Sequence, residues 1–375
     1  MTGERERAPC KPAWLKVRPP AARPYRATQA LLRGLDLHTV CEEARCPNKG
    51  ECFAAGTATF LILGDVCTRA CGFCSVRHDD GAGAAAGVPA GPSAAPPAAA
   101  ALPGEPAGLC ADDEDEPQRV AQAARRLGLR HVVVTSVTRD DLPDGGADAY
   151  ATVVGALRAA VPQATVELLV PDMRGDAQAL ATVLAAGPDV IGHNLETVPR
   201  LYPRVRPQAP YRRSRQLLER AASWARAHED GGARAQDGGG GYTSAQEGGS
   251  DASGPTRAPG GASARPASQS PARAVAGHPL VKTGIMVGLG EQPDEVEELL
   301  ADCARAGVDV LTIGQYLRPA AGCLPVERYV PPAEFVAWAR RGAALGLRVH
   351  AAPFVRSSYR AGELLAREVG TLGSA

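Results

Sequence analysis

The chain has 375 residues, which is enough for one large core, and its 41 basic and 41 acidic side chains give a formal net charge of zero. This balance argues against a nucleic-acid-binding protein, which normally has a basic face, and 4% aromatic residues provide little for base stacking. No apolar run approaches the length of about 18 residues that suggests a membrane span, so we expect a soluble protein without a membrane partner.

The first twenty residues contain acidic side chains, no serine and no apolar stretch, so they predict neither a secretory signal nor a transit peptide. Without export, the ten cysteines are expected to be metal ligands or free thiols rather than disulfides. The expected compartment is the cytoplasm, or the mitochondrial matrix or plastid stroma if the chain is nuclear-encoded.

From residue 58 onward, apolar runs typical of buried strands alternate with helical patterns. The expected strands are Ala58–Gly64, His131–Val137, Thr165–Val170, Asp189–His193, Leu280–Gly288 and Val308–Gly314. The expected helices are Gln118–Leu127, Ala147–Val161, Asp176–Ala186, Tyr211–Arg226 and Pro293–Ala306. Continuous apolar strands separated by helices are typical of parallel strands covered on both faces. We therefore predict an α/β fold, a partial (β/α)6 TIM-like barrel.

The barrel is expected to occupy residues 58–345, between an N-terminal extension (1–57) and a C-terminal extension (346–375). A seventh apolar run, Leu347–Ala352, is expected to flank it. Two low-complexity stretches interrupt the barrel, residues 81–117 and 228–277. Neither has hydrophobic periodicity, so we expect disordered surface insertions rather than domain boundaries.

Polar residues and glycines gather where the expected strands end. These ends are Thr135-Ser136, His193-Asn194-Leu195-Glu196, Gly288-Leu289-Gly290-Glu291 and Gly314-Gln315-Tyr316. The carboxyl ends of parallel barrel strands form one rim, where active sites of such folds lie. The pattern therefore predicts a ligand site at this rim.

Cys67, Cys71 and Cys74 follow the first expected strand with C-x3-C-x2-C spacing. Three thiolates on one loop can ligate three irons of a [4Fe-4S] cluster. The fourth iron is then free to chelate the amino and carboxylate groups of S-adenosylmethionine (SAM). A zinc site is one alternative, and a redox pair of Cys71 and Cys74 is another, although the latter leaves Cys67 unexplained.

Cys41, Cys46 and Cys52 have C-x4-C-x5-C spacing. Alone, this triplet is compatible with a zinc site that has its fourth ligand elsewhere. Its place just before a cluster loop favours a second iron–sulfur cluster. The remaining cysteines, Cys10, Cys110, Cys303 and Cys323, show no ligand spacing, and we assign them no role.

Together these motifs resemble those of lipoyl synthases, a family of radical-SAM enzymes. The cysteines are joined in this resemblance by Thr135-Ser136-Val137, Arg139-Asp140-Asp141, His193 to Val198, Gly288 to Glu291, Gly314 to Leu317 and Arg356-Ser357-Ser358-Tyr359. The resemblance extends from about Lys11 to Leu365, apart from the two insertions.

The resemblance implies a role for individual residues. The radical-SAM [4Fe-4S] cluster would be held by Cys67, Cys71 and Cys74. An auxiliary [4Fe-4S] cluster would be held by Cys41, Cys46 and Cys52, with Ser358 as its fourth ligand. SAM would be contacted by Asn194, Glu196 and Gln315. From composition alone, the two serines would instead be interpreted as a helix N-cap.

The activity implied by the resemblance is that of a sulfurtransferase. It would insert two sulfur atoms, at C6 and C8, into an octanoyl chain on a lysine of a lipoyl carrier domain. The implied partners are octanoylated lipoyl domains of 2-oxoacid dehydrogenase E2 or the glycine cleavage H protein, with ferredoxin or flavodoxin as electron donor. Another radical-SAM sulfur-inserting enzyme, such as one of the biotin synthase type, and a non-catalytic zinc or redox protein are the alternatives.

Overall fold

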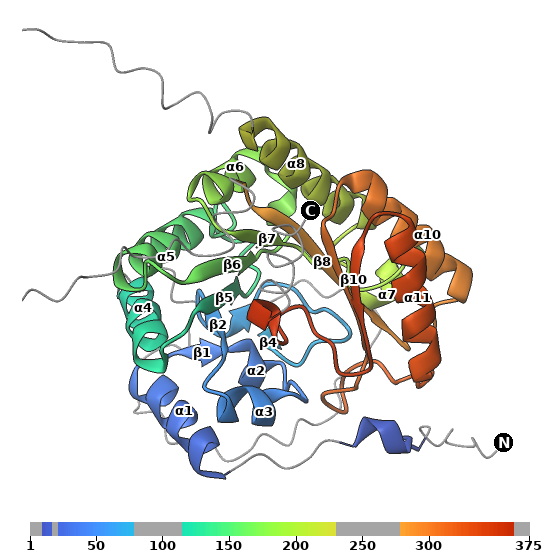
Figure 1. Cartoon of the computed structure of the whole chain (residues 1–375), viewed down its shortest axis with the longest axis horizontal. Coiled ribbons are helices and arrows are strands. Elements are labelled where there is room, and N and C mark those ends of the chain that lie inside the picture. The colour runs from blue at the N-terminus through green and yellow to red at the C-terminus, as the bar shows by residue number, and fades with distance from the viewer. Residues whose placement is uncertain (1–9, 17–21, 79–114, 230–277, 364–375) are drawn as a thin grey trace, which may run out of the picture.

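The computed structural model describes residues 10–16, 22–78, 115–229 and 278–363. Its centre is an eight-stranded sheet that curves into an open barrel (Figure 1). The strands are β1 (His38–Thr39), β2 (Thr59–Ile62), β5 (His131–Ser136), β6 (Thr165–Leu169), β7 (Val190–Gly192), β8 (Leu280–Val287), β9 (Val310–Gln315) and β10 (Arg348–Ala351).

The strands lie side by side in chain order. β1 is antiparallel to β2, and every other neighbouring pair is parallel. The predicted six βα units and the flanking seventh parallel strand are therefore confirmed. β1 and β10 form the two edges of the sheet, so the barrel has an open side between them (Figure 1).

Helices cover the outside of the barrel (Figure 1). They are α4 (Glu116–Leu127), α5 (Ala147–Ala160), α6 (Ala177–Ala185), α8 (Tyr211–Glu229), α10 (Pro293–Ala306) and α11 (Pro332–Ala344). The N-terminal region adds α1 (Ala22–Gly34), α2 (Val40–Glu43) and α3 (Lys49–Ala54), and α7 (Tyr202–Val205) follows β7. Short 3-10 turns lie at Ala13–Leu15, Met173–Gly175 and Pro199–Leu201, and a small second sheet pairs β3 (Val66–Cys67) with β4 (Arg77–His78).

Helix α10 illustrates why the periodicity was sufficient to predict most of these elements. Gln292 and Glu295 form a reciprocal capping box at its start, and Gly307 ends it in a left-handed conformation. Between them, an apolar stripe that includes Cys303 is buried against the sheet. Cys303 is thus a core residue.

The two predicted insertions lie mostly outside the described residues. Helix α4 begins at Glu116, two residues inside the first predicted insertion, and α8 extends to Glu229, two residues inside the second. Cys110 also lies outside the described residues. Among the described helices, none combines the length and the hydropathy needed to cross a bilayer.

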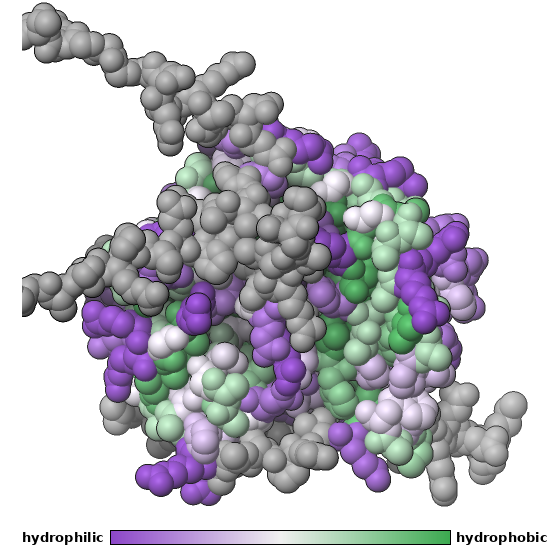
Figure 2. Space-filling model, viewed as in Figure 1, coloured by the Kyte–Doolittle hydropathy of each residue, from purple (hydrophilic) through white to green (hydrophobic). Residues whose placement is uncertain are grey.

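Strand β2 and strands β5 to β9 are almost entirely buried, whereas the edge strand β10 is only partly buried. The surface in Figure 2 mixes polar and apolar side chains. One charged group in the sheet is Glu167 of β6, whose carboxylate lies 2.8 Å from Lys282 Nζ and 3.2 Å from His131 Nε2. Burial alone would raise the pKa of Glu167, but Lys282 and His131 outweigh it and lower that pKa to about 2. The three side chains form a buried charge cluster within the parallel sheet.

After β10 the chain enters the barrel as a C-terminal strap, defined here as Pro353–Glu363 (Figure 1). Gly314 of β9 makes this path possible, because a β-carbon there would lie 2.1 Å from Val355 O. Gly284 of β8 is equally constrained, since its β-carbon would lie 2.8 Å from Ser357 Oγ. The strap therefore lies directly against the inner side of β8 and β9.

Candidate active site

The loop that carries Cys67, Cys71 and Cys74 is fastened to the loop after β5. Thr68 donates to Thr138 O from both its backbone N and its Oγ1, at 3.0 Å each, and its Oγ1 accepts from Asp140 N at 3.0 Å. The first cysteine loop is therefore held at the carboxyl rim of the barrel, where the sequence predicted a site.

Arg69, inside this loop, anchors it electrostatically. Its guanidinium donates to Asp140 at 2.6 and 2.8 Å and to Asp172 at 2.6 Å, and its side chain is only 3% exposed. A bidentate arginine–carboxylate pair fixes orientation as well as charge. Sequence reasoning missed Arg69, although an arginine between two ligand cysteines was a visible signal.

The same loop packs closely on two further segments at Gly72. Gly72 N donates to Val205 O at 3.0 Å, and Gly72 O accepts from Leu324 N at 2.8 Å. A β-carbon at this position would lie 2.9 Å from Arg204 O and 3.0 Å from the Leu324 side chain. Only glycine fits without displacement, which explains the residue type between Cys71 and Cys74.

The three thiols of this loop sit in an environment suited to binding a cation. Cys67 Sγ accepts from the backbone N of Arg69 at 3.4 Å and of Thr138 at 3.3 Å, so its position is fixed by both loops. Burial raises the pKa of Cys71 to about 11 and that of Cys74 to about 12, and the neighbouring thiols add to both shifts. Three thiolates from one loop are the usual ligands of a [4Fe-4S] cluster, so the chemistry of this donor set fits such a group.

The second triplet lies on the N-terminal extension. Cys41 is in α2, whose start is capped by the Thr39 hydroxyl, Cys46 follows the turn after α2, and Cys52 is in α3. Burial raises the pKa of Cys41 to about 12 and that of Cys52 to about 11, and the nearby Cys46 thiol contributes to both. None of these cysteines is in a disulfide. This donor set also fits a cluster.

The C-terminal strap is bound directly to the second triplet's segment. Asn48 Nδ2 donates to Phe354 O at 2.7 Å, while Tyr359 Oη and Arg360 donate to the Glu51 carboxylate at 2.9 and 2.6 Å. Glu51 directly precedes Cys52 in the chain, so the strap lies beside the auxiliary cysteines.

The two adjacent strap serines differ in their partners. Ser357 Oγ donates to Asn194 Oδ1 at 2.8 Å. The Ser358 hydroxyl makes no hydrogen bond within the described part of the chain. Of the two, Ser358 is thus the serine whose oxygen is available as a ligand.

Glu196 and Arg356 are two charged residues that interact electrostatically with cysteines, Glu196 with the first triplet and Arg356 with the second. Burial raises the pKa of Glu196, while Arg206, a hydrogen bond from Asn194 and Arg356 oppose the shift. Burial lowers the pKa of Arg356, and the charges of Cys46 and Glu196 oppose that shift. Arg356 is therefore close enough to interact with a cysteine of the second triplet and with the acidic residue of the rim.

Gln315, predicted to contact SAM, is fully buried and its amide is engaged by the backbone. Its Nε2 donates to Val287 O, Tyr316 O and Arg328 O at 3.0–3.1 Å, and its Oε1 accepts from Val330 N at 2.8 Å. This arrangement makes Gln315 a structural support of the rim and does not support the predicted contact.

Within the described residues, no three His, Cys, Asp or Glu side chains are grouped so as to hold a metal ion. Cluster binding by the two triplets therefore stays a prediction. Cys323, which the sequence left without a role, donates from Sγ to Cys74 O at 3.3 Å and so supports the first cysteine loop.

Two family profiles match the chain: the Radical SAM superfamily over residues 61–223, and the N-terminal domain of lipoyl synthase of the Radical SAM family over residues 2–46. The chain is 44% identical to a lipoyl synthase of Nitratidesulfovibrio vulgaris strain Hildenborough, over 93% of this chain and 91% of the relative. It is 42% identical to a lipoyl synthase of Rubrobacter xylanophilus, over 94% of this chain and 86% of the relative. A crystal structure of methylornithine synthase covers 93% of this chain and 92% of its own at 10% identity, with a TM-score of 0.42.

Proposed function

The chain belongs to the lipoyl synthase family, and from this premise we propose how its residues divide the work of the reaction. The protein is a sulfurtransferase that uses SAM and iron–sulfur chemistry to form the lipoyl cofactor on lipoyl carrier proteins. The finer assignments below concern the number of clusters, their ligands, and the partners.

We assign two [4Fe-4S] clusters to each chain. Cys67, Cys71 and Cys74 hold the first, which leaves one iron for SAM, and Cys41, Cys46 and Cys52 hold the second. When bound, the clusters and SAM supply the radical that removes hydrogen from an unactivated C–H bond and the sulfur that replaces it. The place of the first cysteine loop at the carboxyl rim and the hydrogen bonds between the strap and the segment of the second triplet support this assignment.

Asn194 and Glu196 are proposed to contact the methionine or ribose groups of SAM. Glu196 is partly buried, and its charge raises the pKa values of Cys71 and Cys74, which supports a position of its carboxylate near the first cysteine loop. Ser357 positions Asn194 through the hydrogen bond between their side chains. The strap thereby joins the SAM side of the site to the auxiliary side.

Ser358 is proposed as the fourth ligand of the second cluster. Its hydroxyl has no competing partner in the described regions, and the next two residues bind Glu51 beside Cys52. A hydroxyl is a harder and poorer ligand for iron than a thiolate. This suits a cluster that is taken apart to release sulfur.

The proposed protein substrates are octanoylated lipoyl domains of 2-oxoacid dehydrogenase E2 or the glycine cleavage H protein. Ferredoxin or flavodoxin is the proposed electron donor, and the cytoplasm, mitochondrial matrix or plastid stroma the proposed compartment. Because the two sulfur insertions occur at unactivated carbons, the site must also exclude other hydrogen donors.

The observation that carries the proposal is that one strap is hydrogen-bonded both to the segment of the second triplet and, through Ser357, to Asn194 at the carboxyl rim of the barrel. The test is anaerobic reconstitution, then incubation with SAM, dithionite and an octanoyl-lysyl peptide. The parent should hold about eight iron atoms per chain and add two sulfur atoms to the peptide, measured by mass. Ser358→Ala should still release 5′-deoxyadenosine but lose the doubly thiolated product. A parental yield from Ser358→Ala would remove Ser358 from the ligand set, and zinc in place of iron would overturn the cluster assignment.

A further inference from the structure

The first cysteine loop and the segment of the second triplet are in direct contact at Ser75. The Ser75 hydroxyl donates to Glu43 O at 3.0 Å, in a partly buried environment. Ser75 directly follows Cys74, and Glu43 is the last residue of α2, the helix that contains Cys41. One hydrogen bond therefore joins a neighbour of a first-triplet cysteine to the helix that carries a cysteine of the second triplet.

On the side of the first cysteine loop, the position of Ser75 is fixed by its neighbours. The loop is closed by the pairing of β3 with β4, which places Val66 opposite Arg77, two residues after Ser75. Cys323 Sγ donates to Cys74 O at 3.3 Å, and this oxygen belongs to the peptide group that joins Cys74 to Ser75. A displacement of the Ser75 backbone would therefore also displace Cys74.

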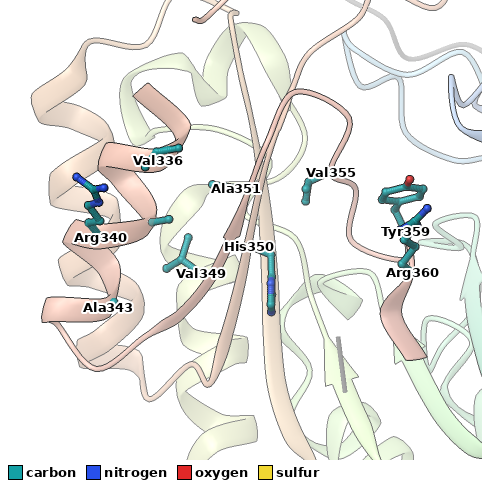
Figure 3. Close-up of a pocket in the computed structure, with 10 residues that line it drawn as sticks. Val336, Arg340, Ala343, Val349, His350, Ala351, Val355, Tyr359 and Arg360 are labelled. Atoms are coloured by element: carbon teal, nitrogen blue, oxygen red, sulfur yellow. The ribbon is translucent and has the colours of Figure 1, made fainter. Parts of the chain in front are cut away.

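The segment of the second triplet is attached to the rest of the protein at both of its ends. Thr39 caps the start of α2 and pairs with β2, so this end is bound to the barrel. Tyr359 and Arg360 of the strap, shown in Figure 3, bind Glu51 of α3 at the other end. Glu43 lies between these two attachments along the chain, and its hydrogen bond links the middle of the segment to the first cysteine loop.

The spacing of the two triplets matters for the proposed function, on which this inference rests. An octanoyl carbon that loses hydrogen on the SAM side must next reach sulfur on the side of the second triplet. Reacting atoms must approach to about 3–3.5 Å, and a misplacement of about 1 Å can cost about a hundredfold in rate. On the same logarithmic scale, a shift of about a quarter of an ångström costs about threefold.

We propose that Ser75 is a positioning residue for sulfur insertion, because its hydroxyl holds α2 at a fixed distance from the first cysteine loop. Loss of the hydroxyl leaves all six cysteines present but lets the two segments shift relative to each other. An octanoyl radical that does not reach sulfur gains one electron from the reductant and one proton from water, and so returns to octanoyl. More 5′-deoxyadenosine is then released for each sulfur atom inserted.

The test compares three variants with the parent after anaerobic reconstitution. Ser75→Ala removes the hydroxyl, and Ser75→Thr keeps it. Ser223→Ala is the matched control, because Ser223 Oγ donates to Glu219 O at 2.8 Å, a hydrogen bond of the same kind within α8. Iron content is measured first, followed by the ratio of 5′-deoxyadenosine to sulfur inserted into the octanoyl-lysyl peptide. EPR of the dithionite-reduced proteins without SAM measures the magnetic coupling between the two clusters, which depends steeply on their separation.

All three variants should hold the parental amount of iron. Ser75→Ala should raise the ratio of 5′-deoxyadenosine to inserted sulfur by about threefold or more and change the magnetic coupling, whereas Ser75→Thr and Ser223→Ala should match the parent in both. Either a parental ratio or an unchanged coupling in Ser75→Ala would overturn the inference. So would an equal rise of the ratio in Ser75→Thr, because the hydroxyl would then not be its cause.

Loss of iron from Ser75→Ala would also overturn the inference, because Ser75 would then be needed to hold a cluster and not to set a distance. Failure of the parent to thiolate the peptide would instead refute the proposed function. The EPR comparison of Ser75→Ala with the parent would in that case still decide whether Ser75 fixes the spacing of the two segments.

Discussion

Lowering the pH from about 7.5 to about 5.5 is expected to destabilise the protein through His193, which is buried neutral. Its Nδ1 lies 2.8 Å from Val170 O, which can only accept, so Nδ1 carries the proton. Its Nε2, 2.9 Å from Ser214 Oγ, then accepts from that hydroxyl, which in turn accepts from Arg206 at 3.2 Å. Protonation of Nε2 would break this chain of hydrogen bonds beside a fixed positive charge.

The magnitude follows from the pKa. Burial and the charge of Arg206, aided by Arg69, outweigh the Val170 hydrogen bond and Asp172 and lower the pKa of His193 from 6.5 to about 4. In the unfolded chain the histidine protonates first, so its contribution to stability is complete above pH 6.5 and is lost as the pH falls towards 4. The full loss is about 3.4 kcal/mol, of which about 1.3 kcal/mol falls between pH 7.5 and 5.5.

The assay is urea unfolding of the cluster-loaded parent and of His193→Asn at both pH values. Asparagine keeps a donor near Val170 but does not titrate. The pH dependence that comes from all other groups therefore cancels when the free energies of unfolding of the two proteins are subtracted. The stability advantage of the parent should shrink by about 1.3 kcal/mol at the lower pH. An advantage that stays constant to within about 0.3 kcal/mol would refute the assignment of a neutral, buried His193.

Three further changes test the fold and the site. Lys282→Met leaves the Glu167 carboxylate buried without its cation and should lower the free energy of unfolding, measured with denaturant, by about 3–5 kcal/mol. Adding Glu167→Leu should restore most of this loss of stability. No recovery in the double variant would contradict the charge cluster. Gly314→Ala places a β-carbon 2.1 Å from a strap oxygen and should therefore displace the strap and lower the iron content. The control, Gly155→Ala in α5, has nothing within 4 Å, so it should leave the iron content unchanged and stabilise the protein by about 0.5–1 kcal/mol. Equal iron content in both variants would count against the strap's role. Cys41→Ala should hold about half of the parental iron and release 5′-deoxyadenosine without thiolating the peptide, and full iron content would exclude Cys41 as a ligand.

Most of the barrel could be predicted because its signals are local. A run such as His131–Ser136 is apolar through its middle, and helix α10 combines an apolar stripe with a capping box. The cysteine spacings are local in the same sense. Each of these patterns lies within about twenty residues, so neither the fold class nor the two triplets depended on knowing the tertiary structure.

Helix α11 was not predicted, because alanines and two apolar faces obscure its periodicity. The path of the strap was also beyond the sequence, since it depends on the absence of a side chain at Gly314 and Gly284. Likewise, Gln315 stands at a strand end like a ligand-binding residue, but its amide is hydrogen-bonded to the backbone of β8 and of the loop that contains Arg328 and Val330. The path of the strap and the partners of Gln315 are determined by contacts between segments that are distant in the sequence, and hydrophobic periodicity does not encode such contacts.

The hydrogen bond between Asn48 and Phe354 joins positions 306 residues apart. During synthesis, the first cysteine loop is complete long before Ser358 has been translated. Under the proposed ligand assignment, the second cluster can therefore be completed only after both partners of this hydrogen bond have been made. A chain cut before Pro353 would use SAM yet lack the proposed fourth ligand of the cluster that supplies sulfur.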